Sequence, residues 1–186
     1  MDIDEFWNTI GNARANSTVD SPFAQVLTDH LAMQSAHFIL GFQERFEEVH
    51  AALYRWDLWA AAYLIGDGCS DDGFIDFRAG LIALGRHWCE KAAVCPDSLA
   101  GHPLVSEAAN GLSGEALFSE AVNYAAAHAF ERVTSGTEDL YQAMERHRDT
   151  QAIPGTGGGI DMGEHFHFDD TQEMCRRLPR LAALFL

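Results

Sequence analysis

The sequence predicts a mainly α-helical protein that forms a single compact domain of about seven helices over residues 1–186. Three observations predict this fold class. Apolar residues recur at steps of three and four along several segments, which is the spacing of one face of an α-helix. No segment of convincing length alternates apolar and polar residues, as a half-buried strand does. Hydrophobic residues make up 47% of the chain, including twelve Phe and four Trp, which is enough apolar material for a core.

Three helices are expected in the N-terminal third. Asp2 or Asp4 can cap a short helix through EFWNTIGNARA. Ser21 and Pro22 are a start signal for a second helix, through FAQVLTDHLAMQ, because Pro is well tolerated at the first helical position. Ser35 is the expected cap of a third helix, whose apolar residues recur at helical spacing: Phe38, Phe42, Phe46, Val49 and Leu53.

The middle of the chain is the expected core. The segment YRWDLWAAAYLI is apolar on nearly all sides and predicts a buried helix that ends at Gly66. A second long amphipathic helix is expected to follow the polar stretch GDGCSDDGFIDFR and to end near Cys95 and Pro96, with these apolar positions: Phe74, Phe77, Leu81, Leu84 and Trp88. Residues 96–112 are expected to form a surface connection with about one turn of helix.

The last third predicts shorter elements around a glycine-rich loop. Ser113 is expected to cap a helix through GEALFSEAVNYAAAHAFERV, and Thr137 to start another through EDLYQAMERHR. The segment IPGTGGGIDMGEHFHF predicts a flexible loop at about 153–168. An Asp-Asp pair then caps TQEMCRRL, and Pro179 breaks that helix before the C-terminal RLAALFL.

Composition and charge restrict the function. The 28 acidic and 12 basic residues give a net charge of −16. Direct nucleic-acid binding is not expected, because it requires a basic patch. No apolar run reaches the roughly 20 residues of a membrane-spanning helix, and the acidic N terminus is unlike a signal peptide. The four cysteines lack CxxC spacing and are expected to be reduced thiols in a cytoplasmic protein. The expected partners are cations, small molecules or basic protein surfaces.

The stretch GDGCSDDGFIDFR (66–78) has a structural and a functional interpretation. Ser70 is a typical N-cap, and Asp71 and Asp72 complement the positive end of the helix dipole. The same two carboxylates oppose a phosphate site and disfavour a thiolate at Cys69. The structural interpretation is a corner between two helices, and the alternative is a ligand or partner site.

Asp57 and Arg78 are charged residues in apolar surroundings. They could form a buried ion pair between their two helices, although Arg55, Arg86 or a backbone group could substitute as a partner. The functional alternative is an arginine and a carboxylate that orient a substrate. Trp59, like its neighbour Trp56, is expected either in the core or as a stacking platform.

The segment GEHFHFDD is a candidate metal site. Glu164, His165, His167, Asp169 and Asp170 supply nitrogen and oxygen ligands that suit a divalent metal ion. In an extended segment the two histidines would point the same way. The alternative is a solvated or docking loop, since no further ligand from elsewhere in the chain is defined.

Three stretches resemble a bacterial family of unknown function, the domain-of-unknown-function family 4240: MDIDEFW, RWDLWAAAYLI-GDGCSDDGFIDFR and RRLPRLAAL. The resemblance spans almost the whole chain and implies a compact, stand-alone, mostly helical cytoplasmic protein without an assigned activity. It carries over these positions: Asp57, Leu58, Trp59, Gly68, Cys69, Ser70, Asp71, Asp72, Gly73, Phe74, Phe77 and Arg78. His165 and His167 stand where the resemblance leads us to expect acidic or aromatic residues, so a metal site there would be particular to this chain.

A shorter similarity concerns the DGFxxF core, Asp72 to Phe77. It is similar to the GGFxxYF signature of a family of acidic dimeric DNA-mimic proteins, with Asp76 at the tyrosine position.

Two hypotheses follow. The leading one is a non-catalytic interaction module, of a regulatory or nucleic-acid-mimic type, that binds a basic protein surface. The alternative is a small enzyme, or a small-molecule or metal-binding protein, with a pocket around Asp57, Cys69–Asp72 and Arg78 that the loop of His165 and His167 closes. No catalytic constellation is complete in the sequence, and no cofactor is expected other than a divalent metal ion at the late loop.

Overall fold

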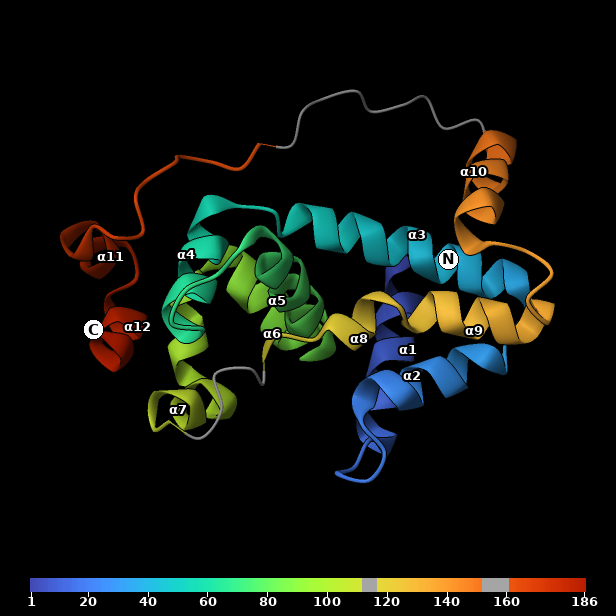
Figure 1. The fold of residues 1–186 in the computed structure, drawn as a ribbon, viewed down its shortest axis with the longest axis horizontal. Helices are drawn as coiled ribbons and strands as arrows, with labels where there is room; N and C mark the ends of the chain where they lie inside the picture. The colour runs from blue at the N-terminus through green and yellow to red at the C-terminus, as the bar shows by residue number, and fades with distance from the viewer. Residues whose placement is uncertain (112–116, 152–160) are drawn as a thin grey trace. The chain divides into compact units, whose positions relative to one another are not determined.

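The computed structural model of the chain describes residues 1–111, 117–151 and 161–186. Within these ranges it contains twelve α-helices, one 3-10 helix and no β-strand (Figure 1). The mainly helical class is confirmed, but the expected number of about seven helices is wrong, because breaks divide several of the expected helices. In this part of the chain no helix combines the length and the apolar character needed to cross a membrane.

The chain divides into two compact units, and each unit combines two segments that are distant in sequence. The first unit contains Met1–Val49 and Ala121–Gly159, and the second contains His50–Glu120 and Ile160–Leu186. Each has buried apolar side chains of its own, such as Phe6 in the first and Phe77 in the second. The expectation of a single domain over the whole chain stays a prediction.

The first unit is built on the N-terminal helices. Its elements are α1 (Ile3–Asn16), α2 (Phe23–Ala32), α3 (Ala36–Ala52), α8 (Glu120–Asn123), α9 (Ala125–Thr134) and α10 (Leu140–Gln151). The end of α3 from His50 onward and the first residue of α8, Glu120, belong to the second unit. Asp2 caps α1 as expected, since its carboxylate accepts a hydrogen bond from the Glu5 amide at 2.7 Å. Helix α2 packs against both α1 and α9. The rings of Phe6 and Phe42 meet at 5.1 Å between centroids in the core of this unit.

The second unit contains the apolar middle of the chain and the C terminus. Its elements are α4 (Trp56–Ile65), α5 (Asp71–Ala83), α6 (Arg86–Val94), the 3-10 helix η1 (Pro96–Gly101), α7 (Pro103–Ala109), α11 (Thr171–Arg177) and α12 (Pro179–Phe185). The residues of α4 are largely buried, as its apolar sequence predicts. The C-terminal α12 packs against α4, α7, α11 and η1.

Two expectations for the second unit are wrong. The long helix expected to reach Cys95 is broken at Gly85, whose φ of 85° lies in the left-handed region that favours glycine, and it divides into α5 and α6. The surface connection expected at 96–112 instead forms η1 and α7, and residues 96–99 of η1 are buried. The polar residues of this segment led us to expect an exposed connection. Asp97 is buried instead, because its carboxylate accepts a hydrogen bond from the backbone amide of Arg180, which is distant in sequence.

Two further expectations involve residues outside the described ranges. Ser113, the expected cap of the helix before α9, lies outside them. The loop expected at 153–168 is described only from residue 161, and residues 161–167 have no regular secondary structure. After this segment Asp170 caps α11 as expected, because its carboxylate accepts hydrogen bonds from the amides of Gln172 and Glu173 at 3.0 and 3.1 Å.

Candidate functional site

The polar stretch after α4 forms a tight corner between two helices. Helix α4 ends at Ile65 with Gly66 as its C-cap, and Asp67 and Gly68 follow with φ angles of 52° and 114°, both in the left-handed region. The Gly68 amide donates to the Tyr63 carbonyl at 2.8 Å, which holds this turn against the end of α4. Ser70 then caps α5, because its hydroxyl accepts a hydrogen bond from the Gly73 amide at 3.1 Å. The structural interpretation of this stretch is therefore confirmed.

The corner opens on a pocket of about 860 Å³, here called the corner pocket, which lies within the second unit. It combines apolar side chains with carboxylates, together with the thiol of Cys69 and the hydroxyl of Ser70. The apolar part includes Leu64, Ile65, Ala108, Phe118 and Phe185, and the carboxylates are Asp67, Asp76 and Glu120. Such a mixture of apolar surface and a few polar groups is typical of ligand-binding pockets.

The segment that carries Phe118 is held closely against α5. A Cβ atom added at Gly80 would lie 1.9 Å from the carbonyl oxygen of Leu117, so only glycine allows this approach. The Ser119 amide donates to the Asp76 carbonyl at 3.0 Å. The backbone on both sides of Phe118 is thus fixed to α5, which gives the corner pocket a firm wall.

Four carboxylates at this corner have no ion pair with a basic side chain in the part of the chain that the structure describes. Among the residues that the structure describes, no Arg or Lys forms an ion pair with Asp67, Asp71, Asp72 or Glu120. The described residues that line the pocket include no Arg and no Lys. The corner is therefore a place of concentrated negative charge.

Cys69 is a poor nucleophile in this setting. Burial, assisted by the negative charges of Asp71 and Asp76, raises the pKa of its thiol to about 11. The thiol therefore stays protonated at neutral pH, and the thiolate is the reactive form of cysteine.

Asp57 and Arg78 do not form the ion pair that the sequence suggested. Asp57 pairs with Arg55, one of the substitute partners that the sequence left open, and its carboxylate also accepts a hydrogen bond from the Leu58 amide at 2.8 Å. Arg78 binds backbone and ring groups rather than a carboxylate. Neither Asp57 nor Arg78 lines the corner pocket, so the expected convergence of these two residues on the pocket is wrong.

Arg78 is a structural cation, and its main partner is His50, which the sequence analysis did not select. The Arg78 residue is 6% exposed. It donates to the His50 carbonyl at 2.9 Å and lies 3.1 Å from His50 Nδ1, while its Nε donates to the Phe74 carbonyl at 3.3 Å. Burial lowers the pKa of Arg78 to about 10. Only proximity in the fold could have revealed this pair, because the two residues lie on different helices.

Trp59 supports the corner from α4. Its ring stacks on Phe74 with centroids 4.8 Å apart and on Trp56 at 5.4 Å. Its indole N–H donates to the Cys69 carbonyl at 3.1 Å. Trp59 therefore has a structural role here and does not line the corner pocket.

The late segment 161–169 lies against α4 and not over the corner pocket. The Trp56 amide donates to the Met162 carbonyl at 3.0 Å, and the His165 ring meets the Trp56 ring edge-on at 4.4 Å. Neither His165 nor His167 lines the pocket. The expectation that these histidines close the pocket is therefore wrong.

The candidate metal ligands of this segment have other partners. Glu164 forms an ion pair with Arg177 at 2.8 Å, and Asp169 accepts a hydrogen bond from the Tyr63 hydroxyl at 2.9 Å. The rings of His165 and His167 lie 5.4 Å apart, as neighbours on one side of the segment would. Across the described ranges no three His, Cys, Asp or Glu side chains are grouped to hold a metal ion. The metal site stays a prediction from the sequence.

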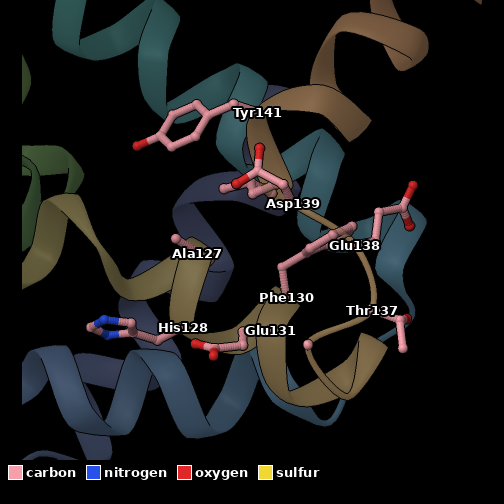
Figure 2. A pocket seen from close by; sticks show the side chains of 10 residues that line it. Ala127, His128, Phe130, Glu131, Thr137, Glu138, Asp139 and Tyr141 are labelled. Atoms are coloured by element: carbon pink, nitrogen blue, oxygen red, sulfur yellow. The ribbon is translucent and has the colours of Figure 1, made fainter.

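A smaller pocket, of about 350 Å³, lies in the first unit between α9 and α10 (Figure 2). His128 and Glu131 come from α9, and Glu138 and Asp139 come from the connection to α10. Two of its carboxylates already have partners, because Glu138 pairs with Arg146 and Asp139 accepts from the Gln142 amide at 3.1 Å. The corner pocket is therefore the larger of the two.

Comparison with known proteins places the chain in a family. No curated protein and no solved structure shows significant similarity to it. The model of one family, described as "Protein of unknown function (DUF4240)", matches residues 1–132. The matched range includes the corner from Gly66 to Arg78, whereas the RRLPRLAAL segment lies beyond it. Because the match covers more than half of the chain, this protein belongs to the DUF4240 family.

Proposed function

We propose that this protein is a non-catalytic interaction module that binds a basic surface of a partner protein. The observation that carries the proposal is the set of carboxylates at the corner between α4 and α5 that have no basic partner among the described residues: Asp67, Asp71, Asp72 and Glu120. A concave surface with unneutralised charge of one sign attracts a partner of the opposite sign and accelerates its association.

The chain carries a net charge of −16, and some of its exposed acidic residues are paired with arginines. Away from the corner, several arginines pair with nearby acids, among them Arg86 with Glu90 at 2.7 Å and Arg132 with Asp29 at 2.5 Å. Exposed pairs of this kind contribute little to stability, but they cancel charge locally. The excess negative charge therefore favours the corner over these neutralised parts of the surface as a binding site.

The chemistry of the corner supports binding rather than catalysis. Its thiol has a pKa of about 11, and a nucleophile needs a lowered pKa or an adjacent base. Arg78 and Asp57, the other candidates for a catalytic group, have structural partners away from the pocket. Nucleic-acid mimicry is a narrower form of the same proposal, in which the carboxylates meet arginines that would otherwise bind phosphates.

Binding of a small organic cation is a second candidate function. The corner pocket, at about 860 Å³, lies within the range of small-ligand pockets, and its carboxylates favour a positively charged ligand. A thermal-shift assay with agmatine and with putrescine tests this function, because a ligand that binds only the folded state raises the melting temperature.

The main proposal is tested by titrating the protein into fluorescein-labelled peptides that contain only Arg and Gly, only Lys and Gly, or only Glu and Gly. We expect the two basic peptides to bind at about 20 mM salt and to bind at least about tenfold more weakly at about 300 mM salt, because salt screens charge attraction. The acidic peptide is the control and should not bind. Absence of binding by both basic peptides at low salt would refute the proposal.

A further inference from the structure

We propose that the corner pocket is the anchor site for a single arginine side chain of the partner protein. This inference rests on the proposed function, since it names the group by which the basic partner is recognised. The corner pocket offers what a guanidinium group requires: several acceptors around it and an apolar surface for its flat face.

The acceptors come from separate elements of the second unit. Asp67 follows α4 and Glu120 lies at the start of α8, and both line the pocket. A guanidinium group carries five N–H donors in a planar fork, so it can bind carboxylates in more than one direction. An ammonium group is a compact and strongly hydrated charge. It would therefore gain less binding free energy from carboxylates placed in different directions around the pocket.

The apolar lining favours the same occupant. Phe118 and Phe185 contribute aromatic rings, and Leu64 and Ile65 contribute aliphatic surface. Guanidinium groups stack on aromatic faces, whereas ammonium groups retain their water more strongly. The methylene groups of the arginine side chain would cover the remaining apolar surface.

The chain uses this arrangement for one of its own arginines. The Arg177 guanidinium lies 4.3 Å from the centre of the Phe166 ring and pairs with both Glu164 and Glu173. An aromatic ring with two flanking carboxylates thus already holds an arginine within this protein. The corner pocket presents a comparable set of groups to the solvent.

The pocket is also firmly built, which lowers the cost of ordering it on binding. The backbone of Asp67 is held in place, because it directly follows the end of α4 and the next residue, Gly68, donates its amide to the Tyr63 carbonyl. Glu120 directly follows the segment that Gly80 and Asp76 hold against α5. The two carboxylates therefore sit on backbone that other contacts already position.

The test compares two double variants with the same net charge. Asp67→Asn with Glu120→Gln removes two carboxylates from the pocket, and Asn tolerates the left-handed backbone at position 67. Asp20→Asn with Glu145→Gln removes two exposed carboxylates from the first unit as the matched control. We expect the pocket variant to bind the Arg-Gly peptide at least about tenfold more weakly than wild type, because charge-assisted hydrogen bonds are lost. The control should change affinity by less than about threefold, through long-range charge alone.

A second pair of variants tests the apolar part of the pocket. Phe185→Ala removes an aromatic ring that lines it, and Leu184→Ala is the control because its side chain is exposed and does not line the pocket. We expect Phe185→Ala to weaken binding of the Arg-Gly peptide more than that of the Lys-Gly peptide. Circular dichroism spectra of all variants check that the fold is retained.

The outcomes separate the two proposals. If neither basic peptide binds wild type, the proposed function is refuted together with this inference. If both peptides bind but the pocket and control double variants lose equal affinity, the arginine pocket is refuted and the proposed function stands. Preference for the Lys-Gly peptide, or agmatine binding as tightly as the Arg-Gly peptide, would also overturn an arginine anchor on a partner protein.

Discussion

Asp97 caps a helix that begins far along the chain, because its carboxylate accepts a hydrogen bond from the Arg180 amide at 2.9 Å across 83 residues. The same oxygen accepts from the Leu181 amide at 2.9 Å. Helix α12 starts directly after Leu178, a residue whose side chain cannot cap it. The buried carboxylate of η1 therefore provides the cap that the local sequence lacks.

Replacing Asp97 by Ala should destabilise the protein by about 2 kcal/mol, since it leaves two amides of α12 without their acceptor in a mostly buried position. Asp97→Asn keeps a carbonyl oxygen and should cost less. Urea unfolding followed by circular dichroism measures both changes. Asp170→Ala, at the exposed cap of α11, is the comparison, and a loss at Asp97 no greater than at Asp170 would contradict the assignment.

His50 should make folding stability depend on pH. Burial, and secondarily the charge of Arg78, lower its pKa from 6.5 to about 4. The unfolded chain therefore binds a proton below pH 6.5, whereas the folded protein binds it only near pH 4, so stability decreases as the pH falls through this interval. We expect a loss of about 2 kcal/mol at pH 5 relative to pH 7.5.

His50→Gln removes this titration and should flatten the dependence between pH 6.5 and 4.5, even if the variant is less stable at pH 7.5. Urea unfolding at several pH values measures the slope, and nitrogen-15 NMR of the imidazole reports the pKa directly. Two results would contradict the buried position of His50 beside Arg78: the same pH dependence of stability in His50→Gln as in wild type, or an imidazole pKa near 6.5.

Gly80→Ala should destabilise the second unit strongly, although alanine ordinarily favours a helix over glycine. The added Cβ would lie 1.9 Å from the Leu117 carbonyl oxygen, so the segment before Phe118 has to move. We expect a cost of about 3 kcal/mol or more, measured by urea unfolding. Gly73→Ala on the same helix is the matched control, because its Cβ would find only ordinary contacts, of 3.4 Å and longer. Equal stabilities of the two variants would argue against the close approach at Gly80.

The four cysteines should react with iodoacetamide at two distinct rates at pH 7.5. Cys95 and Cys175 are exposed and are expected to react first. Burial raises the pKa of Cys69 to about 11 and that of Cys89 to about 12, so both should react at least about tenfold more slowly. Peptide mass spectrometry over time resolves the four sites. Rapid labelling of Cys69 would indicate a thiolate and would favour an enzymatic role for the corner.

The helical class and the corner between α4 and α5 could be predicted because their signals are local. Asp2, Ser70 and Asp170 cap their helices within three residues in sequence, and the apolar repeats of α3 and α4 are continuous. Gly85 breaks the helix through its left-handed backbone conformation, but the apolar repeat continues across it. The repeat therefore predicted one long helix where the structure has α5 and α6.

The candidate site was only partly predictable because most of it depends on distant contacts. Cys69 and Ser70 were selected from the sequence and line the pocket, whereas Phe118, Glu120 and Phe185 reach it only through the fold. Asp57 and Arg78 were selected for their charge. Arg55 was one of several partners that the sequence left open, whereas His50, the partner of Arg78, was not among them. Residue type indicated that each charge needs a partner, and the fold decided which one.

The interleaving of the two units along the chain has a consequence for folding during synthesis. Helices α1 to α3 leave the ribosome first, but α9, which packs on α2, follows only after the whole of 50–120. At roughly 5–20 residues per second, the apolar faces of the first unit wait several seconds for their covering helix. Nascent chains stalled before residue 125 should therefore be the species most dependent on chaperones, and no single proteolytic cut can release either unit intact.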